Sequence, residues 1–203
     1  YLMVFIFMRH QKKNVELYLS VPMLKKIYNP KSAEYLDFKK YCMSEEITWT
    51  YSQRHCEMGD YNPPDWDEDC CNFGFYCHPF LLPPNERYAY SVPISEKTIE
   101  VHDVVKGILE FNKIKVSRIY RIAVNITMPI DGEGHSLPHT DHPFPHKNLI
   151  IYLTDPQGGS TICEGEEFTG KENDAIIFEG KHYNYPPKKG RRIVIVATFS
   201  DYD

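Results

Sequence analysis

Two histidines and an aspartate in the second half of this chain have the residue types and the spacing of a metal site. His139 and Asp141 are separated by one residue, so their side chains point the same way on an extended segment. His182 lies further along the chain and can complete a three-ligand face that leaves other coordination positions open. Such a face suits non-haem Fe(II) better than structural zinc.

Four of the nine histidines fall close together, so more than one of them could be the metal ligand beside Asp141. These four are His135, His139, His142 and His146. On a strand, His139 shares a face with Asp141, whereas His142 points away from it. His182 is the last histidine of the chain and follows an apolar run that is predicted to be a strand. A residue just after such a strand can present a ligand at the open end of a barrel. The other three of the four are expected to be loop residues. The HExxH pattern of helical zinc hydrolases does not occur in the sequence.

Short strands and two helices are predicted around these residues. Segments rich in apolar and β-branched residues, bounded by Gly, Pro and Asp, predict strands at 119–127, 149–154, 161–163, 175–178 and 192–199. Helices are predicted at 33–43 and 95–112, the second with Ser95 or Thr98 as its N-cap. This order indicates a mainly β (α+β) protein: a double-stranded β-helix, or cupin-like jelly roll, with helices packed outside.

The front half of the chain has a different character. Prolines and aromatic residues crowd positions 55–93, which predicts a long excursion with few regular elements, and 61–90 is the expected source of substrate-binding walls. We expect one domain over 1–203, with a helical and irregular elaboration in 1–112 and the jelly-roll core with the metal site in 113–203. The apolar run at 1–8 is predicted to be a buried strand, because it is too short to span a membrane and its charges follow it.

Cysteines and histidines in the front half leave a second metal site as an alternative. The residues concerned are His55, Cys56, Cys70, Cys71, Cys77 and His78. Their spacing lacks a CxxC knuckle, so free thiols are expected in preference to structural zinc. A chain of this size without an export signal is expected to be reduced and intracellular. The net charge of −5 and the lack of a basic tract give no support to a duplex nucleic acid partner.

The C-terminal half resembles the Fe(II)/2-oxoglutarate dioxygenases, particularly the prolyl-4-hydroxylase-like branch and similar phage-type oxygenases. The resemblance covers about residues 119–199 and is carried by motifs that occur in the family's order. These motifs are the pair His139-x-Asp141, Tyr152-Leu153, Gly158-Gly159-x-Thr161, an apolar strand ending at Phe178, His182, and Arg192. The double-stranded β-helix is also the fold that this resemblance implies.

The resemblance implies that His139, Asp141 and His182 hold Fe(II), and that Arg192 pairs with the distal carboxylate of the co-substrate 2-oxoglutarate. The physical argument for Arg192 agrees: it begins an apolar strand, where an unpaired charge is costly, and a guanidinium can hold a carboxylate with two hydrogen bonds. Arg191 points the opposite way on a strand and is the poorer candidate.

Three further residues are candidates for the co-substrate site. Tyr152 occupies the place of a tyrosine that hydrogen-bonds the same carboxylate in prolyl-hydroxylase-like relatives. Asn125 and Thr127 share one face of an otherwise apolar strand, near the place where the family often has a tyrosine. Asn125 is therefore assigned to co-substrate binding, and Thr127 is its alternative.

The implied reaction uses 2-oxoglutarate and O2 to hydroxylate a primary substrate, with release of succinate and CO2 and with ascorbate as the expected reductant. A prolyl or other protein residue is the first expectation for the substrate, which the sequence does not identify. The alternative is a non-catalytic, cupin-like binding module. Such a module would be favoured if a fourth protein ligand, such as His142 or His146, closed the metal face.

Overall fold

The computed structural model describes residues 24–53, 73–131 and 134–201 of the protein. The helices within these ranges are α1 (Ala33–Cys42) and α2 (Thr98–Phe111). The strands are β1 (Leu24–Ile27), β2 (Thr50–Ser52), β3 (Phe75–Leu82), β4 (Val92–Pro93), β5 (Val116–Thr127), β6 (Lys147–Tyr152), β7 (Gln157–Gly158), β8 (Thr161–Cys163), β9 (Glu166–Phe168), β10 (Ala175–Phe178), β11 (His182–Asn184), β12 (Pro187–Lys189) and β13 (Arg192–Asp201). None of the described helices is both long enough and apolar enough to cross a membrane.

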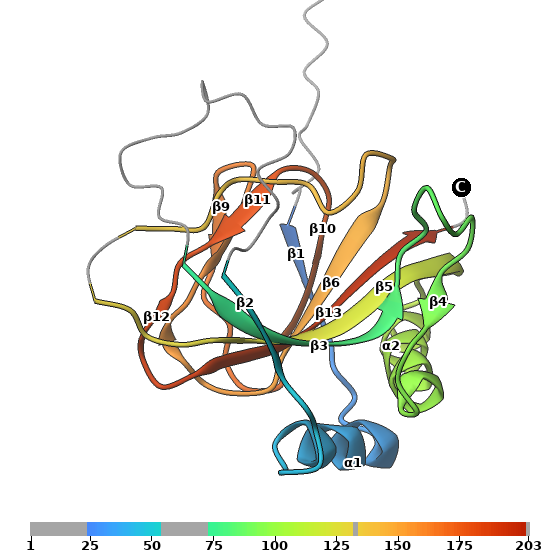
Figure 1. Ribbon diagram of the computed structural model, residues 1–203, viewed down its shortest axis with the longest axis horizontal. Helices are drawn as coiled ribbons and strands as arrows, with labels where there is room; N and C mark the ends of the chain where they lie inside the picture. The colour runs from blue at the N-terminus through green and yellow to red at the C-terminus, as the bar shows by residue number, and fades with distance from the viewer. Residues whose placement is uncertain (1–23, 54–72, 132–133, 202–203) are drawn as a thin grey trace, which may run out of the picture.

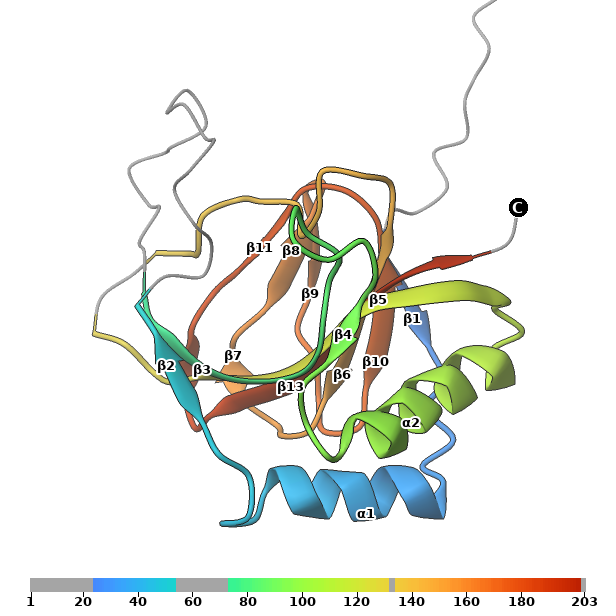
Figure 2. The ribbon, with the colours of Figure 1, turned by 45° about the vertical axis from the view of Figure 1, so that its right-hand side comes forward.

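The strands form one large antiparallel sheet and two small ones (Figure 1). The order in the large sheet is β1-β10-β6-β13-β5-β3-β2, and β4 pairs with β3. The strands β11, β8 and β9 form a second sheet, and β12 pairs with β7. The large sheet is curved, and the small sheets face its inner side (Figure 2). This arrangement confirms the predicted double-stranded β-helix.

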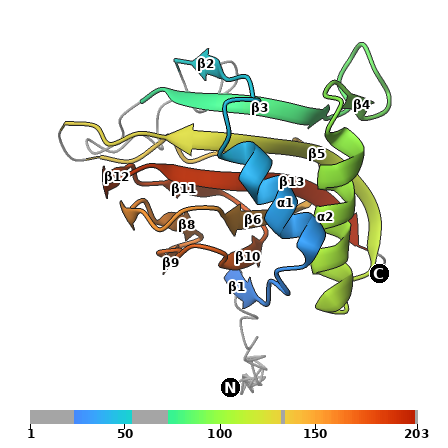
Figure 3. The same cartoon turned by 90° about the horizontal axis from the view of Figure 1, so that it is seen from below.

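Successive side chains of a strand point to opposite faces of the sheet, and this divides the core into two parts. Leu149 and Ile151 of β6 belong to the larger apolar cluster, which includes the buried faces of α1 and α2. Ile150 and Tyr152 point the other way, into a smaller cluster that includes Cys163 of β8. Both helices lie across the outer face of the large sheet (Figure 3). The inner face of the sheet is therefore left to line the interior of the barrel.

Both predicted helices are confirmed, but α2 starts differently from the prediction. α1 follows Ser32, whose hydroxyl caps its first turn. The expected N-cap of α2 was wrong, because the N-cap is Lys97 and it makes no side-chain capping bond. The Ser95 hydroxyl oxygen accepts the Lys97 N–H (3.3 Å) in the turn before the helix. The Thr98 hydroxyl donates to the Phe80 carbonyl (2.8 Å), and the Ser95 hydroxyl bonds His78 Nε2 (3.2 Å), so both hydroxyls connect the start of the helix to β3.

The predicted irregular stretch contains a long strand, and that part of the prediction was wrong. β3 pairs with β5 in the large sheet and also with β2 and β4. Pro79 lacks a backbone donor, and the register of β3 on β5 shifts between Pro79 and Leu81. A bulge tolerates a proline that a regular ladder would not. Since β1 and β2 also come from the front half, that half supplies part of the large sheet.

Two predictions from the front half lie largely outside the described residues. The strand expected at 1–8 lies outside them, as do four members of the Cys/His cluster at positions 55, 56, 70 and 71. Of the other two members, Cys77 has a free thiol whose pKa is raised by burial. The His78 ring bonds through Nδ1 to the Thr48 carbonyl (2.7 Å) and through Nε2 to the Ser95 hydroxyl (3.2 Å). His78 is thus already engaged through both ring nitrogens.

Candidate metal centre

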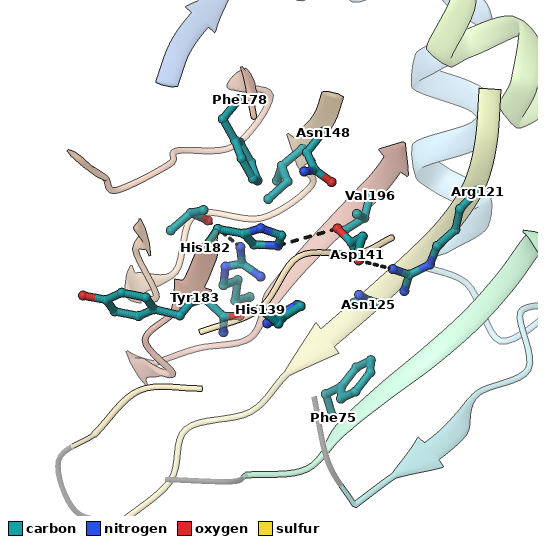
Figure 4. Close-up of a pocket in the computed structure, with 14 residues that line it drawn as sticks. Phe75, Arg121, Asn125, His139, Asp141, Asn148, Phe178, His182, Tyr183 and Val196 are labelled. Carbon is teal, nitrogen blue, oxygen red and sulfur yellow. Dashed lines mark hydrogen bonds and ion pairs between the residues drawn. The ribbon is translucent and has the colours of Figure 1, made fainter. Parts of the chain in front are cut away.

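A short backbone pairing brings the three residues of the predicted metal site together. The His139 and His182 backbones each donate one hydrogen bond to the other, both at 2.9 Å. His182 is the first residue of β11, and His139 lies on the segment before β6. Asp141 Oδ2 lies 3.6 Å from His182 Nε2 (Figure 4). One ligand atom from each of the three residues lies within 4.8 Å of the others.

Hydrogen bonds at the far side of each imidazole select the tautomer that a metal needs. His139 Nδ1 lies 2.8 Å from the Leu137 carbonyl, and His182 Nδ1 lies 3.3 Å from the Gly180 carbonyl. A carbonyl only accepts, so each Nδ1 carries a proton, and the neutral tautomer with this proton has its lone pair on Nε2. Burial lowers the pKa of His182 to about 4, although the Asp141 carboxylate opposes this. The His182 imidazole is therefore neutral near pH 7.

Asp141 is held by an arginine that the sequence analysis did not identify. Arg121 Nη1 on β5 donates to Asp141 Oδ1 at 2.6 Å, whereas Asp141 Oδ2 is buried and has no hydrogen-bond partner among the described residues. Burial alone would raise the pKa of Asp141, but Arg121 and the neighbouring imidazoles hold it well below its usual range. The signal for Arg121 was its position four residues before Asn125, on the same face of an apolar strand. Asp141 therefore presents an ionised, unpaired oxygen beside the two imidazoles.

These donors fit a divalent transition metal. Two neutral imidazole nitrogens and one carboxylate oxygen are the ligand set that non-haem Fe(II) takes with coordination positions left open. The unpaired Asp141 Oδ2 supports this fit, because a buried carboxylate oxygen without a partner is costly.

The other nearby histidines are used differently. His142 Nε2 hydrogen-bonds the Thr198 hydroxyl at 2.7 Å, and its ring stacks on Phe144. His146 Nδ1 bonds the Phe144 carbonyl at 2.7 Å. Neither belongs to the group of potential ligands that the described residues form. This disfavours a metal face closed by a fourth histidine.

Arg192 lies in a buried position with donors to spare. Its Nε donates to the Gly159 carbonyl (3.0 Å) and its Nη2 to the Thr161 hydroxyl (2.9 Å). No carboxylate of the described residues forms an ion pair with it, although the residue is only 3% exposed. Gly159 adopts φ +74, and a Cβ there would come within 3.1 Å of Arg192 Cδ, so only glycine fits this turn comfortably. A buried, unpaired guanidinium of this kind calls for an anionic ligand.

Tyr152 lies behind this arginine. Its hydroxyl hydrogen-bonds the Thr161 hydroxyl at 2.9 Å, and the Arg192 guanidinium lies 5.4 Å from the centre of its ring. Tyr152 is fully buried and does not line the pocket, whereas Thr161 does. Thr161, which the sequence analysis took only as part of a turn motif, thus offers a pocket-lining hydroxyl that bonds Arg192 directly.

The two polar candidates on β5 are also on the inner face. Asn125 lines the pocket, and its Oδ1 is buried without a partner in the described structure. Thr127 is fully buried directly opposite Arg192 on β13, and its hydroxyl is likewise unpartnered. Both sit at the Arg192 end of the barrel, as their assignment to the co-substrate requires.

The metal triad and Arg192 line the same pocket. Figure 4 shows the three triad residues in it. It lies inside the barrel and is partly open to solvent. Its apolar lining is formed by Phe75, Ile150, Phe178 and Val196, and its polar lining includes Arg121, Asn125, Asn148, Thr161, Tyr183 and Asn184. Its lining residues include members of β3, β5, β6, β8, β10, β11 and β13. A ligand that chelates a metal at the triad and extends to Arg192 would thus stay inside one cavity.

Comparison with known proteins identifies the fold through structures and not through sequence. No family model matches the sequence, and no curated protein matches it. An oxidoreductase of the 2OG-Fe(II) oxygenase family from Burkholderia pseudomallei matches with a TM-score of 0.63 and 12% identity, over 87% of this chain and 84% of that one.

Two further solved structures agree. A prolyl hydroxylase from Trichoplax adhaerens, in complex with a hypoxia inducible factor peptide, has a TM-score of 0.51 and 12% identity, over 88% of this chain and 84% of its own. The non-haem α-ketoglutarate-dependent epimerase SnoN from nogalamycin biosynthesis has a TM-score of 0.52 and 12% identity, over 88% of this chain and 78% of its own. The chain therefore has the fold of the Fe(II)/2-oxoglutarate oxygenases, as the resemblance of its sequence implied.

Proposed function

We propose that the protein is an Fe(II)- and 2-oxoglutarate-dependent dioxygenase formed by a single domain. The observation that carries this proposal is the pocket itself, which joins an open three-ligand face to a buried arginine without a carboxylate partner. A diacid bound at one end to a metal and at the other to a guanidinium satisfies both groups.

In this proposal each residue has a defined task. His139, Asp141 and His182 hold Fe(II), which when bound supplies the oxygen activation that amino-acid side chains cannot. Arg192 and Thr161 bind the distal carboxylate of 2-oxoglutarate, and Tyr152 supports them from behind. Asn125 contributes a further hydrogen-bonding group beside the co-substrate.

The proposed reaction inserts one oxygen atom of O2 into a C–H bond of the substrate. The other oxygen atom enters succinate as 2-oxoglutarate loses CO2. Ascorbate is the proposed reductant in the assay. A prolyl or other protein residue remains the first substrate to test, and the hydroxylase with its bound peptide lends this some support. The epimerase shares the same fold, so the fold by itself does not choose a substrate.

The test of this function is binding followed by turnover. Purified protein is titrated with Fe(II) without oxygen, then with 2-oxoglutarate, and succinate is measured after O2 and ascorbate are added. We expect one metal per chain, loss of metal binding in His139→Ala, and loss of 2-oxoglutarate binding in Arg192→Ala. Removing a buried charge partner costs about 3–5 kcal/mol, whereas the exposed neighbour in Arg191→Ala should change little.

A non-catalytic binding module is the alternative, and the same measurements separate the two. Metal binding without 2-oxoglutarate binding or succinate formation would favour the module. Equal losses of 2-oxoglutarate affinity in Arg191→Ala and Arg192→Ala would refute the anchor assignment.

A further inference from the structure

Asn148 on β6 carries a buried amide group that the fold does not use. The residue is fully buried, and it lines the pocket that contains the metal triad. Neither its Oδ1 nor its Nδ2 has a hydrogen-bond partner among the described residues. A buried polar group left unpaired costs about 1–3 kcal/mol, so native structures rarely keep one without a reason. Its neighbours Leu149 and Ile151 point to the opposite face and make ordinary core contacts.

The register of the strands places Asn148 in a definite layer of the barrel. Asn148 is directly opposite Thr198 on β13 and Phe178 on β10, and Thr198 is opposite Arg121 on β5. The His182 ring packs on Phe178, with centroids 4.9 Å apart, so this layer adjoins the metal triad. Figure 4 shows Asn148 among the side chains on the His182 and Asp141 side of the pocket.

The residues proposed to bind the distal carboxylate of 2-oxoglutarate lie in a different layer of the barrel. Tyr152 is four residues beyond Asn148 on the same face of β6 and lies opposite Val194, which pairs with Asn125. Four residues of strand span about 13 Å. The five-carbon chain of 2-oxoglutarate spans only about 5 Å, from carbon–carbon bonds of about 1.5 Å. Thr198, which is opposite Asn148, lies six residues beyond Arg192 on β13, so Asn148 is at the end of the pocket away from Arg192. A diacid that extends from the metal triad toward Arg192 therefore leaves Asn148 to a different molecule.

The polar neighbours in the layer of Asn148 bond other residues and do not bond its amide. The Thr198 hydroxyl is occupied by His142 Nε2 at 2.7 Å. Arg121 is committed to Asp141 at 2.6 Å, and it is a donor that could serve only the amide oxygen. The Asn148 amide therefore faces the pocket without a partner among the described residues.

We infer that Asn148 is a specificity-determining residue, and that the primary substrate presents an amide-type edge to it. This inference rests on the proposed oxygenase function and names the substrate chemistry of the same pocket. A carboxamide offers one acceptor and a pair of donors, so it is matched most fully by a group with an adjacent N–H and C=O. A site built around such a bond rejects analogues that leave its buried polar group unpaired.

The first experiment measures stability without ligands. Asn148→Leu removes the unpaired amide and should raise the melting temperature of the metal-free protein by a few degrees. Asn112 is the matched control, because its side chain bonds the Tyr28 backbone and caps α2, so Asn112→Leu should lower the melting temperature. Asn148→Ala, which adds no bulk, covers the case in which leucine does not fit.

The second experiment measures ligand choice in the diamagnetic Zn(II)–2-oxoglutarate complex. N-methylacetamide and methyl acetate, which differ in one N–H, are titrated while the Asn148 side-chain NH₂ signal is followed by NMR. In the wild type we expect N-methylacetamide to bind at least about fivefold more tightly than the ester, and to shift that signal. In Asn148→Leu and Asn148→Ala the preference should disappear while zinc and 2-oxoglutarate still bind.

The outcomes separate this inference from the proposed function. If the wild type binds neither metal nor 2-oxoglutarate, the oxygenase proposal fails, and the substrate inference falls with it. If both bind but the Asn148 variants lose 2-oxoglutarate affinity, the amide serves the co-substrate and the inference is wrong. Equal binding of the two probes, or a lower melting temperature in both Asn148 variants, would also overturn it.

Discussion

The pair formed by Arg121 and Asp141 decides how the carboxylate of the triad faces a metal. Arg121 uses one carboxylate oxygen, and the other is left beside His182 Nε2. Groups that orient metal ligands typically contribute a factor of 10–100 to metal affinity. Arg121 therefore belongs to the site, although it lies on β5 and not on either of the two segments that carry the ligands.

We predict that Arg121→Met weakens Co(II) or Zn(II) binding by about 10- to 100-fold, because Asp141 loses the bond that orients it. Arg121→Gln keeps a donor for Oδ1 and should stay within a fewfold of the wild type. Isothermal titration of both variants checks this. Tighter binding in Arg121→Met would mean that the positive charge of Arg121 repels the metal more than its hydrogen bond helps.

In the proposed co-substrate site, Thr161 takes over part of the role that the sequence analysis gave to Tyr152. Thr161 lines the pocket and bonds Arg192 directly, whereas Tyr152 reaches the anion only through Thr161. Thr161→Val should therefore weaken 2-oxoglutarate binding by about tenfold, in line with the loss of one hydrogen bond of about 1.5 kcal/mol. Tyr152→Phe should weaken it less. A larger loss in Tyr152→Phe, measured with the metal bound, would restore Tyr152 as the direct contact.

At the scale of elements, the loop between β9 and β10 packs against the Tyr152 ring, which in turn lies against Arg192. Gly170 lies against the Tyr152 ring so closely that an added Cβ would overlap with it. The ring is fully buried and packs against Arg192, so it has little freedom to move away. The position of Arg192 thus depends on a glycine in a segment that supplies no functional side chain.

Gly170→Ala should lower the free energy of unfolding by about 1–3 kcal/mol, the usual cost of overpacking a core, and should weaken 2-oxoglutarate binding. Gly107→Ala is the matched control. Gly107 lies in the exposed middle of α2 with open space at its Cβ, so alanine there should raise stability by about 0.5–1 kcal/mol. Denaturant unfolding of both variants checks this, and similar changes in the two would show that the Tyr152 ring yields easily.

At the scale of the whole molecule, a bound metal would link segments that are distant in the sequence. His139 and Asp141 precede β6, and His182 begins β11 of the small sheet. The direct backbone link of His139 to β11 is one pair of hydrogen bonds. A ligand that binds only the folded chain stabilises it by mass action, and the gain is about 2.7 kcal/mol at one hundred times its dissociation constant.

We therefore predict that saturating Zn(II) or Co(II) raises the melting temperature by about 5–10 °C, since a chain of this size gains about 2–4 °C per kcal/mol. Thermal unfolding with metal, and again after a chelator is added, measures the effect. His182→Ala should show no rise. A rise that persists in His182→Ala would place the metal elsewhere on the protein.

The sequence by itself predicted five strands of the second half and both helices, and it selected His139, Asp141, His182 and Arg192 as candidate site residues. The short strands β7, β9, β11 and β12 were not predicted. The predicted features follow from periodicity and short spacing, because neighbours two apart on a strand share a face whatever the rest of the chain does. The resemblance to a known family added the order of the motifs and the fold.

Only the tertiary structure decided the rest, because strand register joins residues that are far apart in the chain and leaves little local signal. The pairing of β5 with β13 and of β13 with β6 puts Arg121 in the layer of Asn148, and a short bridge sets His139 beside His182. The strand at Pro79 was missed because proline disfavours a regular ladder, whereas a bulge against β5 accommodates it. Which polar groups stay unpaired, above all the amide of Asn148, depends on every neighbour at once, so no stretch of sequence could reveal it.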